Sequence, residues 1–256
     1  MTARLSRNVR SQIMKPPTDN GYISECLIHW TGRDSDKRGA DTLSIIASSC
    51  ELLLSYNRIH VFDWYHEIHE KMVCFTDVPL GHSNTHCRRY GRFGVAFHKL
   101  KLMNAGAQPV FYVSHAAKRD MDTIFRFLRQ QSRSTTLAPD VFRALHRHFY
   151  FMQRLSEGRA DGRDTYYYER EWRLGAQSLP TQQELDRPNA RYWCQQEGYG
   201  AYIGIRVIHG DKEHFSFDPS CVAFLIAPRS WQSCVANPHG FQLYAFEALV
   251  EGMDQD

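Results

Sequence analysis

One nine-residue stretch, Tyr166 to Leu174, constrains the fold most because its apolar and polar residues alternate. In a β-strand, successive side chains point to opposite faces of the sheet. The more apolar face, which suits a core, would carry Tyr166, Tyr168, Arg170, Trp172 and Leu174. The opposite face would carry Tyr167, Glu169, Glu171 and Arg173. The stretch therefore predicts a strand with one buried and one polar face.

The polar face of this strand brings two carboxylates together. Glu169 and Glu171 would lie about 7 Å apart, because a strand rises roughly 3.3 Å per residue. Two interpretations stay open for such a pair. A solvated edge strand tolerates both charges, whereas a Glu-x-Glu pair could instead act on a cationic or ribose-bearing substrate.

The composition indicates an ordinary globular protein with reduced thiols. A chain of 256 residues forms one large domain or two small ones, and an apolar share of 43% is usual for such proteins. The formal net charge of +3 is too small to indicate nucleic-acid binding by itself. The seven cysteines are scattered and lack any CxxC pair, which favours free thiols in a cytoplasm over a disulfide framework.

The sequence predicts a cytoplasmic protein that does not enter a membrane. No apolar run approaches the roughly 18 residues of a membrane span. The first residues also lack the continuous apolar region of a signal peptide. Four basic residues among residues 1–20 instead predict a flexible basic arm, followed by a single domain over residues 21–256.

The order of predicted elements indicates an α+β fold. Asp34-Ser35-Asp36 is a helix-start signal, and apolar residues then recur at intervals of three and four over residues 38–55. Further helices are expected over residues 82–90, 120–131, 140–155 and 228–235. Strands are expected over residues 72–78, 93–97, 109–113, 199–207, 220–226 and 241–250. Residues 116–157 would then form a helical insertion.

A histidine-rich segment raises the question of a metal site. His66 and His69 are three residues apart, whereas the zinc-protease pattern needs two histidines four apart. A third ligand is not evident nearby. We therefore expect a loop or short helix with surface histidines, and no metal.

Three clusters besides the two glutamates could carry chemistry. His29 and Thr31 end a predicted strand and could hydrogen-bond a ribose, although a partly buried histidine with a local partner explains His29 equally well. Phe75 could stack on a flat ring, while Asp77 is best explained as a helix cap. The basic residues Arg88 and Arg89, with their neighbours His86 and Tyr90, could bind a diphosphate because arginine forks match phosphate oxygens. A solvated basic helix is the alternative.

The motifs that would indicate other chemistries are missing from the sequence. No serine lies in a G-x-S-x-G elbow. The chain also has neither a P-loop nor a G-x-G-x-x-G fingerprint, so ATP hydrolysis and Rossmann-type cofactor binding are not expected.

Several motifs resemble those of the AbiGi-type abortive phage-resistance family. They are Leu27-Ile28-His29-Trp30-Thr31-Gly32-Arg33, Val73-Cys74-Phe75-Thr76-Asp77-Val78-Pro79-Leu80, His86 with Tyr90-Gly91-Arg92-Phe93-Gly94-Val95-Ala96-Phe97, Gly106 with Pro109-Val110-Phe111-Tyr112, and Glu169-Arg170-Glu171-Trp172-Arg173-Leu174. That family is described as the antitoxin half of a phage-abortive pair. The resemblance implies a cognate toxin or antitoxin partner.

The order of these motifs also resembles that of ADP-ribosyltransferases, with an ambiguous middle motif and no plain Ser-Thr-Ser. This resemblance implies a split β-sheet core, NAD as a substrate and no metal. The residues it implies for NAD are His29, Thr31, Gly32, Arg33, Phe75, Thr76 and Tyr90. The residues it implies for the acceptor substrate are His86, Arg89 and Arg173.

Within that resemblance, the two glutamates would be catalytic. NAD splits through an oxocarbenium-like state, and Glu171 near the ribose would stabilise the developing positive charge. Glu169 would orient the acceptor or take its proton. The leading prediction is thus an NAD-dependent mono-ADP-ribosyltransferase toxin of anti-phage defence that modifies RNA or DNA. Two alternatives stay open: an antitoxin or binding module that neutralises a partner toxin, and a metal-free ribonuclease toxin.

Overall fold

A computed structural model describes residues 24–59, 68–133, 141, 148–154, 169–186 and 204–250. The basic arm predicted over residues 1–20 lies outside these ranges, as does His66, and the side chain of His69 is not described. The domain boundaries drawn from the sequence therefore stay predictions.

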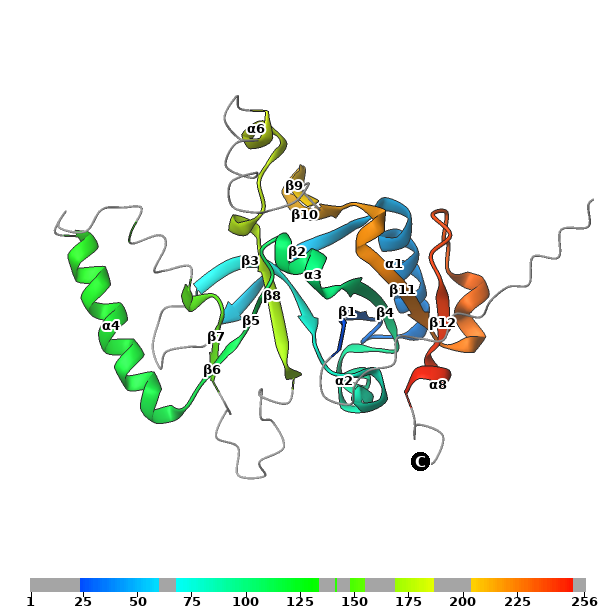
Figure 1. The fold of residues 1–256 in the computed structure, drawn as a ribbon, viewed down its shortest axis with the longest axis horizontal. Coiled ribbons are helices and arrows are strands. Elements are labelled where there is room, and N and C mark those ends of the chain that lie inside the picture. Colours follow the sequence, from blue (N-terminus) through cyan, green and yellow to red (C-terminus); the bar gives the residue numbers. More distant parts are fainter. Residues whose placement is uncertain are drawn as a thin grey trace, which may run out of the picture.

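A mixed ten-stranded sheet forms the centre of the molecule (Figure 1). Its strands are β1 (Cys26–Thr31), β2 (Glu51–Ile59), β3 (Ile68–Thr76), β4 (Phe93–His98), β5 (Gln108–Pro109), β8 (Glu171–Gly175), β9 (Gly204–His209), β10 (Lys212–Phe217), β11 (Val222–Ala227) and β12 (Leu243–Ala245). Hydrogen-bonded neighbours follow the order β12-β11-β4-β1-β3-β2-β10-β9. β8 pairs with both β3 and β5, so the sheet branches at β3.

A smaller unit lies at one end of the molecule, at the left of Figure 1. It contains the two-stranded parallel sheet of β6 (Phe111–Val113) and β7 (Met152–Arg154), together with the long helix α4 (His115–Arg133). α4 confirms the first helix of the predicted insertion. The second predicted helix, over residues 140–155, is wrong at its end, because Met152–Arg154 forms a strand beside Phe111–Val113.

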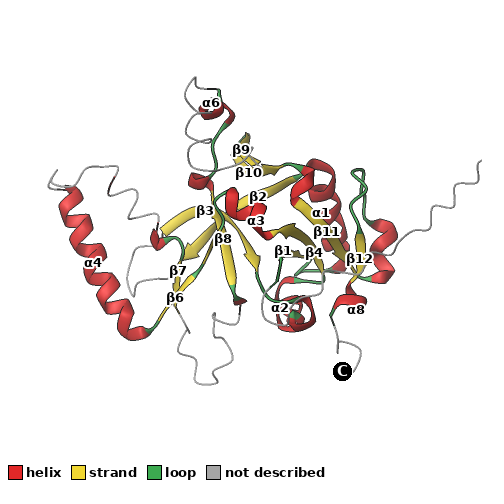
Figure 2. Ribbon diagram, viewed as in Figure 1, coloured by secondary structure: helices red, strands yellow, loops and turns green. Residues whose placement is uncertain are grey.

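The other helices are short, apart from α1 (Figure 2). The α-helices are α1 (Asp36–Ser49), α2 (Asn84–Tyr90), α3 (Lys99–Asn104), α6 (Gln182–Leu185) and α8 (Phe246–Leu249). The 3-10 helices are η1 (Leu80–His82), η3 (Ala176–Ser178), η4 (Pro219–Cys221) and η5 (Arg229–Cys234). None of the described helices is both long and apolar enough to cross a membrane.

Helix α1 begins where the sequence predicts and ends earlier. Ser35 caps it by accepting a hydrogen bond from the Arg38 amide. Cys50 then adopts the left-handed conformation, with φ of 53°, and its N–H bonds the Ile46 carbonyl. That conformation stops the helix. The predicted helix over residues 38–55 is therefore too long, since its last residues belong to strand β2.

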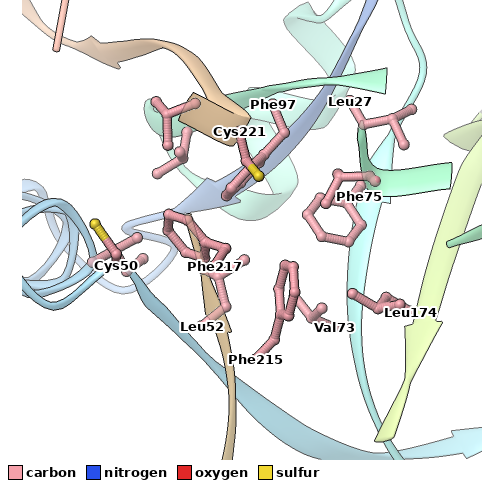
Figure 3. Packing of buried hydrophobic residues seen from close by; sticks show 14 of the residues in the cluster. Leu27, Cys50, Leu52, Val73, Phe75, Phe97, Leu174, Phe215, Phe217 and Cys221 are labelled. Carbon is pink, nitrogen blue, oxygen red and sulfur yellow. The ribbon is translucent and has the colours of Figure 1, made fainter. Parts of the chain in front are cut away.

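The main core fills one face of the sheet, beneath α1. Figure 3 shows Val73, Phe75, Leu174, Phe215 and Phe217 meeting there from the three strands β3, β8 and β10. Trp172 also belongs to this core. The alternation predicted for the β8 stretch is thus confirmed for residues 171–174.

The opposite face of the sheet is covered in two separate places. In the first, α2 and α8 pack on Ile28 and Trp30 of β1 through residues such as Cys87 and Phe246. In the second, the unit that contains α4 packs on Met72 of β3 through an aromatic cluster of Phe125, Phe149, Tyr150 and Phe151. Together the elements confirm the predicted α+β class.

Candidate functional site

A cavity of about 300 Å³ lies on this second face, between the two covered regions. Its volume is at the lower end of the range typical of ligand pockets. Strands β1, β2 and β3 supply most of its walls, and α2 and the residues around the start of β8 supply the rest. Its lining residues are Ile28, His29, Trp30, Leu53, Ser55, Met72, Val73, Cys74, Phe75, Thr76, His86, Tyr90, Glu169 and Glu171.

The cavity exists because two strands share one edge of β3 and diverge. β2 pairs with the first half of β3, up to Met72, whereas the described register joins β1 to β3 only at Ile28 and Thr76. β8 pairs with the other edge of β3 over residues 72–76. At Cys74, between the two pairings, the Nδ1 atom of His29 lies 2.9 Å from the backbone carbonyl oxygen. A histidine ring thus takes the place of a strand at this point.

The bond to Cys74 fixes the state of the His29 ring. A carbonyl oxygen only accepts hydrogen bonds, so Nδ1 of His29 carries the proton. Burial lowers the pKa of His29, against the opposing effect of this hydrogen bond, and favours the neutral ring. Nε2 is then left with a lone pair and acts as an acceptor.

Glu169 is held by two residues of α2. Its carboxylate forms an ion pair with the Arg89 guanidinium and accepts a hydrogen bond of 3.3 Å from the Tyr90 hydroxyl. Burial raises the pKa of Glu169, while the charge of Arg89 opposes that rise. The sequence predicts Glu169 on the same strand as Glu171, but the strand begins only at Glu171. Arg170 has φ of 43°, so the chain turns just before β8.

The backbone of Glu169 is fixed as well. Its carbonyl oxygen accepts hydrogen bonds from the Thr76 hydroxyl at 2.8 Å and from Nε2 of His86 at 3.1 Å. Nε2 of His86 therefore carries a proton. Burial lowers the pKa of His86, so the neutral ring is favoured and its Nδ1 is an acceptor.

Glu171 forms a bidentate ion pair with a buried arginine. Nε and Nη2 of Arg173 each lie 2.9 Å from one of its two carboxylate oxygens. Arg173 is only 4% exposed, and it also donates to the carbonyl oxygens of Tyr150 and Met152 and to the side chain of Gln153. This arginine therefore lies outside the cavity and connects β8 to the smaller unit.

Seven of the predicted site residues line the cavity, and five do not. Those that line the cavity are His29, Phe75, Thr76, His86, Tyr90, Glu169 and Glu171. Those that do not are Thr31, Gly32, Arg33, Arg89 and Arg173. Arg33 is exposed, and Gly32 has φ of 92° and packs closely on Gly39, so this turn has a structural explanation.

Asp77 is not the helix cap that the sequence predicts. It is 5% exposed and forms ion pairs with Lys99 at 2.6 Å and with Arg170 at 3.4 Å. The helix that follows has no side-chain cap at its first turn. The reason is that Asp77 lies inside the fold, where a buried carboxylate needs a cation.

Sequence reasoning missed the contribution of β2 to the cavity. Leu53 and Ser55 line it, whereas their neighbours Leu52 and Leu54 point into the main core. The alternation of these four residues is a strand signal, but it follows a helical pattern without a glycine or proline between them. Trp30 is a second missed residue. Its indole N–H is buried and has no hydrogen-bond partner among the described residues.

Comparison with known proteins identifies a family. The model of the family described as "Putative abortive phage resistance protein AbiGi, antitoxin" matches residues 48–187. No curated protein and no solved structure matches. The matched segment includes β2, β3, α2 and β8, and with them most of the cavity lining.

This match overturns the prediction of an NAD-dependent ADP-ribosyltransferase toxin, because the family is described as an antitoxin. The match does not test the catalytic roles predicted for Glu171 and Glu169, and it gives no support to RNA or DNA as an acceptor. No structural neighbour supports an ADP-ribosyltransferase-like core, so only the α+β class stands. NAD binding stays an untested prediction. Since the match covers more than half of the sequence, the chain belongs to the AbiGi family of abortive phage-resistance proteins.

Proposed function

We propose that this chain is the antitoxin of an abortive-infection pair and acts by binding and neutralising a cognate toxin. The family match carries the proposal. The state of the candidate site agrees with it, since both glutamates already have cationic partners, Arg89 and Arg173. Such a site is better suited to recognition than to holding a nucleophile or a general base.

The cavity is our candidate for the point where the toxin is anchored. Several side chains of its lining can accept hydrogen bonds: the carboxylates of Glu169 and Glu171, Nε2 of His29 and Nδ1 of His86. A carboxylate has about four lone-pair sites, so an ion pair leaves room for a further donor. The fitting occupant is therefore a donor-rich cationic side chain, an arginine or lysine of the toxin. Buried pockets that receive one such anchor often dominate the binding energy of an interface.

A growth experiment tests the antitoxin function. The reading frames next to this gene are expressed one at a time, with and without this chain. We expect one neighbour to arrest growth, co-expression to restore it, and the two purified proteins to elute together. Growth arrest by this chain alone, or no relief of arrest caused by any neighbour, contradicts the proposal.

A single substitution tests the anchoring site. Glu169→Gln keeps the side-chain shape and removes the charge, so we expect it to weaken binding of the purified neighbour by at least about tenfold, or 1.4 kcal/mol. The measurement is isothermal titration calorimetry, with circular dichroism as the check on folding. Glu25→Gln, at an exposed position outside the cavity lining, is the matched control. Equal affinity of both variants would leave the antitoxin function standing but exclude the cavity as the anchor.

A further inference from the structure

Three side chains with metal-ligand chemistry meet on the β2–β10–β9 end of the sheet. They are Glu51 at the start of β2, His209 at the end of β9 and His214 within β10. Each offers one ligand atom, and these atoms all lie within 4.8 Å of one another. The group is separate from the cavity described above, since none of the three lines it.

The strand register explains why they meet. Glu51 lies opposite Ser216, and His209 lies opposite Lys212. Directly paired residues share a face of the sheet, as do residues two apart in one strand. Glu51, His209 and His214 are therefore on one face. Phe215 and Phe217 point the other way, into the main core.

The contacts within the group are already close to those of a ligand set. Nε2 of His209 lies 3.1 and 3.2 Å from the two carboxylate oxygens of Glu51. The two imidazole rings have centroids 5.1 Å apart. Nδ1 of His214 is buried and has no hydrogen-bond partner among the described residues. A buried polar atom without a partner is costly, which makes this nitrogen the independent sign of a missing ligand.

We propose that Glu51, His209 and His214 bind a divalent transition-metal cation, with Zn²⁺ as the ion that fits best. Two imidazoles and one carboxylate suit Zn²⁺, whereas Mg²⁺ and Ca²⁺ prefer oxygen ligands alone. Zn–N bonds of about 2.0–2.1 Å put tetrahedral ligands about 3.4 Å apart. The Glu51–His209 spacing already meets this requirement, and the ligand atom of His214 lies within 4.8 Å of the other two.

Binding of the cation requires a change of tautomer at His209. In the metal-free protein, Nε2–H of His209 donates to Glu51. When the cation binds, that proton moves through solvent to Nδ1 of the same ring, so that the Nε2 lone pair binds the metal and the ring stays neutral. Lys212 shares this face, but it is exposed and can direct its ammonium group into water. His209 is half exposed, so a fourth coordination position faces solvent.

A bound cation would connect three neighbouring strands. β9 is at one end of the main strand order, and the cation would link it to β2 across β10. Since the ligand set exists only in the folded protein, binding stabilises the fold by mass action. The inference does not depend on the antitoxin function.

Metal titration of the purified full chain tests the site. The background carries Cys234→Ser, because the exposed thiol of Cys234 would itself bind Zn²⁺. After treatment with a chelator, Zn²⁺ is titrated against a chromophoric competitor and thermal unfolding is followed in parallel. We expect one Zn²⁺ to bind, Tm to rise, and equimolar Mg²⁺ to leave Tm unchanged.

Ligand variants decide the outcome. His209→Ala and Glu51→Gln should each weaken Zn²⁺ binding by more than about a hundredfold, since even loss of an outer partner of a ligand costs about 10- to 100-fold. His82→Ala removes an exposed imidazole elsewhere and should leave the affinity unchanged. The proposal is overturned if the chain binds no Zn²⁺, or if the ligand variants and the His82 control bind it equally.

Discussion

Arg173 is a buried guanidinium whose hydrogen bonds connect two parts of the protein. It chelates Glu171 on its own strand and donates to Tyr150, Met152 and Gln153 in the smaller unit. Such a buried pair need not stabilise a protein more than apolar residues of the same volume would. Removal of one partner, however, leaves the other charge buried and unpaired.

Arg173→Met should therefore lower the free energy of unfolding by about 3–5 kcal/mol. Urea denaturation at neutral pH measures this loss. Arg38→Met is the matched control, because its ion pair with Asp34 is exposed and such pairs contribute about 1 kcal/mol at most. If both variants lose an equally small amount of unfolding free energy, Arg173 does not hold the two units together.

At the residue scale, the sequence predicts which face of a strand a side chain lies on better than it predicts the hydrogen-bond partners of that side chain. Residues two apart in a strand share a face, so the proximity of Glu171 and Arg173 follows from their spacing. The chelation does not, because it depends on carbonyl oxygens some twenty residues earlier in the chain. The turn at Arg170 has no pattern of its own either, so the orientation of Glu169 could not be derived.

The junction between α2 and β4 depends on one glycine. Gly91 has φ of 104°, and a Cβ atom there would lie 2.3 Å from the Thr31 carbonyl oxygen. We expect Gly91→Ala to destabilise the protein by at least about 2 kcal/mol, from backbone strain and from this clash. Gly81→Ala, ten residues earlier, meets nothing within 4 Å and should change stability by less than about 1 kcal/mol. Chemical denaturation compares the two, and equal effects would contradict the strain argument.

Helix α4 offers a matched pair of phenylalanines. Phe125 is 5% exposed and packs edge-on against Phe149, with ring centroids 5.0 Å apart, whereas Phe127 is 58% exposed. Phe125→Ala should cost about 3–5 kcal/mol as a large-to-small core change. Phe127→Ala should change the free energy of unfolding by no more than about 0.5 kcal/mol. Thermal unfolding of both variants measures the difference, and a large loss at Phe127 would mean that this face of α4 is covered.

At the element scale, the errors of prediction have local causes. Helix and strand patterns overlap at residues 50–55, and only the left-handed backbone at Cys50 separates α1 from β2. The strand predicted over residues 241–250 is wrong after Ala245, where helix α8 begins. β10 was not predicted at all, because only Phe215 and Phe217 mark its buried side among charged and polar neighbours.

The stability of the whole molecule should depend on pH through its buried histidines. Burial lowers the pKa of His29 and of His86 below their ordinary value of 6.5. The unfolded chain then binds more protons than the folded one between 6.5 and the lower folded values. By linkage, stability is complete above pH 6.5 and is lost as the pH falls through that window.

His29→Asn tests this dependence. Its amide can replace the donor Nδ1 toward Cys74, but it does not titrate. The loss of unfolding free energy between pH 7.5 and pH 5.5 should therefore be smaller in the variant than in the wild type. His82→Gln, which changes an exposed ring, should keep the wild-type difference. Identical pH profiles for all three proteins would mean that the His29 ring is not held neutral.

At the scale of the whole molecule, the fold class was predictable and the topology was not. The order of elements indicates α+β correctly. The neighbours of each strand depend on long-range packing, such as β4 lying between β1 and β11. The cavity follows from that topology, since it opens where β1 and β2 diverge from β3.

The strand order also determines when each strand can pair with its neighbours during synthesis of the chain. β4 is bounded on one side by β1, made shortly before it, and on the other by β11, which leaves the ribosome more than a hundred residues later. β2 likewise cannot complete its pairing until β10 has been synthesised. Until then, two strands expose unsatisfied amide and carbonyl edges that can pair with other polypeptides. Because the sheet is completed so late, a half-synthesised chain would be prone to aggregation and to attack by proteases.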